Sequence, residues 1–147
     1  MLQHLLLHTT VGWIDLALLI GRAFIGVCFI IHGLGKLGIV GQGNMDGFVA
    51  WLKSMGVPMA EMQARIAMLC ELVGGTLIAT GLLMRFGALL CLGTMLVAAT
   101  IGHKGGGYLI TNNPPGNEYT INLAAILIMF LLIGPGAYSL DHALFGN

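Results

Sequence analysis

The chain has 147 residues, of which 57% are hydrophobic and only 8% are charged, and its formal net charge is zero with histidine neutral. A soluble globular domain carries about a quarter charged residues, so this composition excludes a water-soluble protein. Zero net charge gives no reason to expect a nucleic-acid partner. The length fits one domain, and we expect an all-α integral membrane protein in the lipid bilayer.

The first predicted membrane span covers residues 14–35, an apolar run that is interrupted by Arg22 and closed by Lys36. At 1.5 Å per residue, a helix of this length crosses a hydrocarbon core of about 30 Å. The preceding segment, MLQHLLLHTT, has no basic region, and no small-residue cleavage pattern follows it. We therefore expect no signal peptide, and the first span should remain in the mature protein.

A glycine-rich stretch, residues 37–64, separates the first two spans and contains a short amphipathic helix at residues 46–55. Apolar residues in this helix fall on one face: Phe48, Trp51, Leu52 and Met55. The pattern is typical of a helix that lies in the membrane interface. Gly56 and Pro58 should end it.

Three further spans are predicted at residues 66–83, 86–101 and 119–133. Only Met84 and Arg85 join the second span to the third, which indicates a tight antiparallel hairpin. The last two spans are short for a full crossing, so either their helices extend into the loops or the bilayer thins locally. No internal repeat is visible, and we predict a four-helix membrane bundle with a short interfacial helix between spans one and two.

Glu71 is the single charged side chain of the second span. A carboxylate near the bilayer core is costly, so it should face other helices and find a partner there. Glu71 also falls in a row with Ala67, Gly75 and Ala79 at four-residue spacing. Small residues in such a row let the backbone of a neighbouring helix come close.

Antiparallel threading of four spans puts both termini at one end of the bundle, side A, and the loops 37–64 and 102–118 at the other end, side B. Side A carries Arg22 and Arg85 near the span ends. Side B carries more cationic residues: Lys36, Lys53, Arg65 and Lys104. The positive-inside rule therefore predicts that side B faces the cytoplasm.

Polar residues at membrane depth gather near side B: His32, Lys36, Glu71, His103, Lys104, Glu118 and Asn122. Such a group could hold a polar headgroup and move protons. We expect Glu71 to be the proton acceptor or donor, with His32 or His103 as hydrogen-bond partner of the headgroup. Three further residues would help to bind it: Lys36, Glu118 and Asn122. The structural alternative is interfacial snorkelling of the cations and one hydrogen-bonded glutamate.

A second polar layer lies near side A: Asp15, Arg22, Arg85, Asp141 and His142. Arg22 is well inside its span and must either snorkel or find a partner. Asp141, which follows a GPG break, is the expected partner. We interpret Arg22, Arg85 and Asp141 as a structural ion-pair clamp.

Three cofactors are compatible with the side B residues to different degrees. A quinone needs an apolar slot with a histidine or carboxylate at one end, and all of these are present. Haem ligation by His32 and His103 is less favoured, because His103 lies at or beyond a helix end. A metal site of Cys28, His32 and Glu71 has helical spacing for its first pair only. The three cysteines form no CxxC pair and read as free thiols.

Several segments in the same order resemble the DoxX family of small four-helix membrane proteins. These segments are GRAFIGVCFIIHGLGKL at 21–37, F-x-x-W-L and G-V-P within 48–58, ELVGGTLIATGLLMRFGALL at 71–90, the Glu before Tyr119, and GPGAYSLD at 134–141. The family's founding members are membrane subunits of a thiosulfate:quinone oxidoreductase. The resemblance implies a quinone-linked redox role for five polar residues within the motifs: Arg22, Glu71, Arg85, Glu118 and Asp141. His32 and His103 rest on spacing alone.

These observations predict a membrane subunit of a quinone-linked oxidoreductase, in the inner membrane of a bacterium. No redox centre is visible in the chain, so electrons would come from a partner subunit. The alternative is a non-catalytic assembly or anchoring subunit, and a homo-oligomer is compatible with either. A small-molecule carrier is less favoured, since neither an internal repeat nor a pair of broken helices is visible.

Overall fold

The computed structural model describes residues 11–146, and all regular structure in that range is helical. The elements are α2 (Val11–Lys36), α3 (Met45–Ser54), α4 (Ala60–Thr80), α5 (Met84–Val97), the π-helical turn η1 (Ala98–Gly102), α6 (Glu118–Ile133) and α7 (Leu140–Phe145). The all-α prediction is confirmed. The expectation for the N-terminal segment, residues 1–10, lies outside the described residues.

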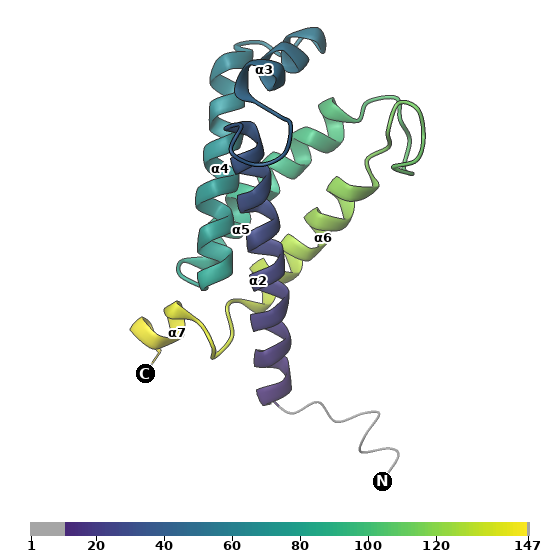
Figure 1. Ribbon diagram of the computed structural model, residues 1–147. Coiled ribbons are helices and arrows are strands. Elements are labelled where there is room, and N and C mark those ends of the chain that lie inside the picture. The colour runs from purple at the N-terminus through teal and green to yellow at the C-terminus, as the bar shows by residue number, and fades with distance from the viewer. Residues whose placement is uncertain (1–10, 147) are drawn as a thin grey trace.

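Three helices are long and apolar enough to cross a membrane: α2, α4 and the continuous helix Met84–Gly102 formed by α5 and η1. The fourth, α6, is also apolar but has 16 residues, which corresponds to about 24 Å at the helical rise. All four predicted spans are therefore present as helices. At one end lie α7 and the start of α2, and at the other lie α3 and the 103–117 loop (Figure 1), as the threading predicted.

Helix α4 starts at Ala60, before the predicted span at residue 66, and ends at Thr80. A run of apolar residues predicts only the part of a helix that lies in lipid. The helix itself begins and ends where its backbone hydrogen bonds do, so the two boundaries differ. Gly81 ends α4 in the left-handed conformation, with φ 68°, which glycine adopts without steric cost. The hairpin turn is therefore 81–83, and Met84 and Arg85, expected in the turn, begin α5.

Close contact between α2 and α4 depends on small residues. A Cβ atom on Gly26 would lie 2.5 Å from both the backbone nitrogen of Ala79 and the carbonyl oxygen of Gly75. The predicted role of the Gly75–Ala79 row, a close approach of a neighbouring backbone, is confirmed. On its other side α4 packs against α5, where Gly74 faces Gly87.

Helix α3 lies beside the side B ends of α2 and α4 (Figure 1). The side chain of Asn44 caps it by accepting a 2.8 Å hydrogen bond from the backbone nitrogen of Gly47. Leu52 is buried with three residues around the start of α4: Val57, Ala60 and Ala64. The predicted short amphipathic helix is therefore present at Met45–Ser54, and it packs against α4.

Candidate functional site

A cavity of about 660 Å³ lies at the side B end, between the four long helices and under α3. Helices α4 and α5 touch near the hairpin, where a Cβ on Gly74 would be 2.6 Å from the sulfur of Cys91. Further from the hairpin the two helices diverge (Figure 1). The resulting space is lined mainly by apolar side chains, with a few polar groups among them.

Lys36 and Glu71 form an ion pair in the cavity wall, with 2.5 Å between Nζ and Oε2. Glu71 is 5% exposed, and a carboxylate so deeply buried requires a partner. Lys36 leaves the last turn of α2, so its ammonium reaches inward from the helix end. The same ammonium lies 4.9 Å from the ring centroid of Phe48 on α3, a cation–π contact.

One turn earlier on α2, His32 contacts α6. Its Nε2 atom is 2.6 Å from the hydroxyl of Tyr119, and that hydroxyl is also 3.4 Å from the sulfur of Cys28. The hydroxyl has one proton to donate, so it donates to one neighbour and accepts from the other. His32, Tyr119 and Cys28 thus form a short hydrogen-bonded chain that links α2 to α6.

Helix α3 and the turn η1 complete the cavity. Trp51 stacks against Phe48, with 5.8 Å between ring centroids, and it lines the cavity beside Gly102 of η1. A π-helical turn widens a helix locally and often occurs beside functional sites. His103 follows η1 and lines the cavity, and its Nδ1 is 3.1 Å from the carbonyl oxygen of Pro115.

The structure brings four of the predicted side B residues to one cavity: His32, Lys36, Glu71 and His103. Glu118 and Asn122 are not among the residues that line it. Oε2 of Glu118 accepts a 3.1 Å hydrogen bond from the backbone nitrogen of Ile110, and Oδ1 of Asn122 accepts one from the hydroxyl of Tyr108. These two residues fasten the 103–117 loop to α6, rather than facing the other polar groups.

No three His, Cys, Asp or Glu side chains within residues 11–146 gather closely enough to hold a metal ion. Cys28 and Glu71 contact different residues: Cys28 contacts Tyr119, and Glu71 contacts Lys36. His32 and His103 line the same cavity, but each has a ring nitrogen engaged by a protein group.

The expected ion pair between Arg22 and Asp141 is not formed. In the described range the ion pairs are Lys36–Glu71 and Lys53–Glu61. Arg22 is 2% exposed and donates to the carbonyl oxygen of Tyr138, while Arg85 donates to the carbonyl of Leu132. Leu132 is in the last turn of α6, where carbonyl groups lack partners within the helix. Both arginines thus bind backbone carbonyls and not Asp141.

Asp141 has a comparable role at the hairpin. Its carboxylate accepts hydrogen bonds of 2.7 and 3.2 Å from the backbone nitrogens of Leu83 and Met84, the start of α5. Leu83 provides no side-chain cap of its own. Asp141 therefore caps α5 from a distance of 57 residues in sequence, through backbone groups.

Replacing this cap should destabilise the hairpin. We expect Asp141→Ala to lower the free energy of unfolding by about 1–2 kcal/mol, the usual effect of removing a helix N-cap. Asp141→Asn should lose less, because its amide oxygen can still accept one of the two bonds. Thermal unfolding in detergent checks both variants, and equal stability of Asp141→Ala and the wild type would contradict the cap.

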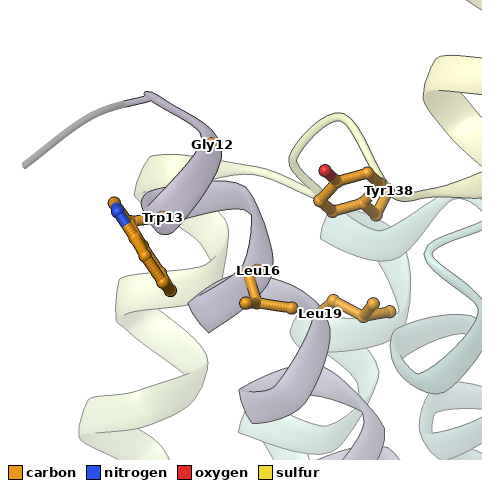
Figure 2. A pocket seen from close by; sticks show the side chains of 5 residues that line it. All are labelled: Gly12, Trp13, Leu16, Leu19 and Tyr138. Carbon is orange, nitrogen blue, oxygen red and sulfur yellow. The ribbon is translucent and has the colours of Figure 1, made fainter.

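A second hollow lies at the side A end of α2, lined by Gly12, Trp13, Leu16, Leu19 and Tyr138 (Figure 2). The hydroxyl of Tyr138 is the one polar side-chain group here that ionises. Unlike the cavity under α3, this hollow has no acid–base pair along its wall.

Tyr119 and Trp51 are the site residues that sequence reasoning missed. In the sequence, Tyr119 is the first residue of the fourth predicted span and the neighbour of Glu118, and Trp51 belongs to the apolar face of a short helix. An aromatic ring with a polar tip at the start of a span, at the depth of His32, was the available signal.

Comparison with known proteins agrees with this architecture. The chain is 32% identical to inner membrane protein YphA of Escherichia coli over 130 residues, covering 85% of the chain and 88% of the relative. It is 31% identical to inner membrane protein YqjF of the same organism, covering 88% and 93%. No solved structure matches.

These relatives and the apolar helices identify the chain as a multi-pass inner membrane protein. A family model described as DoxX matches residues 17–104, which include most of α2 and all of α3, α4 and α5. The match contains the four predicted residues that line the cavity, and the resemblance carried by the motifs is thereby confirmed. The chain belongs to the DoxX family.

Proposed function

We propose that the protein is the membrane subunit of a quinone-linked oxidoreductase and binds a quinone headgroup in the cavity under α3. One observation carries this proposal. The cavity is mainly apolar and has two proton-exchanging pairs in its wall, Lys36–Glu71 and His32–Tyr119. Its volume, about 660 Å³, falls within the range typical of small-molecule sites.

The residues present fit such a group. His32 and Lys36 are four residues apart on one face of α2, so they lie about 6 Å apart along the helix. This spacing would let one planar ring meet both polar pairs, and Trp51 adds an aromatic side chain to the cavity wall. A bound quinone supplies the capacity to accept two electrons and two protons.

The chain's own groups would manage the protons. The hydroxyl of Tyr119 can turn its one proton towards a headgroup if it accepts hydrogen bonds from His32 and Cys28, its two neighbours. The carboxyl of Glu71 can take up or release a proton beside the Lys36 ammonium. Electrons would come from a partner subunit. The rival proposal remains a non-catalytic assembly or anchoring subunit, in which these pairs only hold the helices together.

Ligand binding by variants of Tyr119 tests the proposal. Tyr119→Phe keeps the ring and removes the hydroxyl, so a headgroup that bonds to it should bind about tenfold more weakly, the equivalent of one hydrogen bond. The matched control is Tyr108→Phe, because Tyr108 contacts Asn122 outside the cavity. Binding of a decyl-substituted benzoquinone can be followed by quenching of tryptophan fluorescence in detergent.

Quinone that copurifies in a fixed ratio, together with weaker binding by Tyr119→Phe alone, would support the proposal. Glu71→Gln should then abolish turnover of the assembled complex without loss of folding. A wild-type protein that binds no quinone, but copurifies with a second polypeptide in constant ratio, would favour the accessory subunit instead.

A further inference from the structure

The cavity reaches the outer surface of the helices between α4 and α5. Its lining includes residues on the buried face of α5, among them Met95, and residues on the opposite face, Leu89, Gly93 and Val97. The last three follow one another at four-residue spacing. Leu89 is 55% and Val97 47% exposed, so the cavity extends past α5 to the exposed face of that helix.

Helix α4 provides the other side of this opening. Ile66 and Cys70 line the cavity and stand one turn apart, and Ile66 is 50% exposed. Towards the hairpin the two helices close tightly, since a Cβ on Gly87 would lie 2.7 Å from Cβ of Leu77. We call the gap bounded by Ile66, Cys70, Leu89, Gly93 and Val97 the lateral opening.

We infer that the ligand is a membrane-dissolved quinone with an apolar tail, and that the tail leaves the cavity through the lateral opening. This inference rests on the proposed function and specifies the substrate class. The charged pair Lys36–Glu71 lies inside the cavity. Around the lateral opening, three side chains are aliphatic, Gly93 has no side chain, and the thiol of Cys70 is the one polar group. A polar ring bound to the pair and an alkyl chain towards the bilayer match this distribution.

Gly93 is the position in the lateral opening where a side chain can be added. It is exposed, and a Cβ added there would meet no heavy atom within 4 Å. A larger side chain therefore fits without strain and improves the helix propensity of α5. Gly93→Phe would put a ring into the gap while leaving the polar pairs unchanged.

The experiment compares two probes: a benzoquinone with a decyl chain and the same ring with a methyl group in its place. The chain has two tryptophans, so a Trp13→Phe background leaves Trp51, which lines the cavity, as the fluorescent reporter. In that background, Gly93→Phe should weaken binding of the decyl probe by at least about tenfold. The same variant should weaken binding of the probe without the chain by less than about twofold. For each probe, binding by Gly93→Phe is compared with binding by the protein that keeps Gly93. The partition of the probe into detergent is the same in both measurements and therefore cancels.

Gly12→Phe is the matched control. Gly12 lies in α2, and an added Cβ there also meets nothing within 4 Å, but the position lines the side A hollow (Figure 2). The Gly12→Phe variant should bind both probes as tightly as the protein with Gly12. Gly93→Ala should also bind both, because a methyl group leaves the lateral opening unblocked.

Two results would overturn the inference while leaving the proposed function intact: unchanged binding of the decyl probe by Gly93→Phe, or equal weakening of both probes. The first would mean that the tail leaves elsewhere, and the second that the ring of the ligand itself lies at Gly93. Absence of binding of either probe to the protein with Gly93 intact would instead overturn the proposed function.

Discussion

Lys36→Met should lower the free energy of unfolding by about 3–5 kcal/mol, the usual loss when one member of a buried ion pair is removed. Glu71 is buried, and Lys36 is its ion-pair partner in the described part of the chain. Without the ammonium, the carboxylate remains in a cavity wall with no opposite charge. At this chain length, thermal unfolding in detergent should occur about 10 °C lower.

The two members of this pair should not be equivalent. Glu71→Gln leaves an amide that can still accept a hydrogen bond from Lys36, and the long stem of Lys36 can carry its charge towards water. This variant should therefore lose only about 1–2 kcal/mol. Replacing both residues with methionine should restore stability to within about 1 kcal/mol of the wild type, because two apolar residues leave no buried charge.

Lys53→Met provides the control for this prediction. Lys53 and Glu61 also form an ion pair, at 2.9 Å, but both side chains are exposed, so solvent and salt screen their interaction. The unfolding temperature should not change. A drop equal to that of Lys36→Met would show that loss of any lysine near α3 destabilises the protein, and would contradict the special role of the buried pair.

The depth of polar residues along each span could be predicted from sequence, and the cavity follows from it. Counting helical rise places Glu71 about 9 Å in from Arg65 and His32 about 6 Å in from Lys36, and both line the cavity. The ion-pair partner of Glu71 is nevertheless Lys36, from the span end, at 2.5 Å. Depth does not fix the direction in which a side chain leaves the helix. Glu118 and Asn122 have the expected depth and spacing, yet they face the 103–117 loop.

The partners of Arg22 and Asp141 could not be predicted for a different reason. Sequence shows charged side chains but hides the backbone groups that helix ends leave unpaired. Arg85 binds the carbonyl of Leu132 in the last turn of α6, and Asp141 binds the amides of Leu83 and Met84 at the start of α5. Arg22 binds the carbonyl of Tyr138, in the segment between α6 and α7.

Gly75→Val should be the most damaging single change in the membrane helices, with loss of the folded protein. A Cβ on Gly75 would lie 2.7 Å from the carbonyl oxygen of Gly26 and 3.0 Å from the backbone nitrogen of Ile30. Overpacking against side chains costs about 1–3 kcal/mol, and here the atoms belong to backbone, which cannot rotate away. Gly26→Val should act in the same way, since it meets the backbone of α4.

The matched control is Gly93→Val, which introduces the same side chain into a transmembrane helix where no atom lies within 4 Å. It should extract and elute from size exclusion like the wild type, whereas Gly75→Val and Gly26→Val should aggregate. Alanine at position 75 should give an intermediate unfolding temperature, because its single methyl group meets the same backbone atoms. Equal behaviour of Gly75→Val and Gly93→Val would mean that α2 and α4 do not approach as closely as described. Since α2 carries Lys36 and α4 carries Glu71, that result would also separate the two halves of the cavity's ion pair.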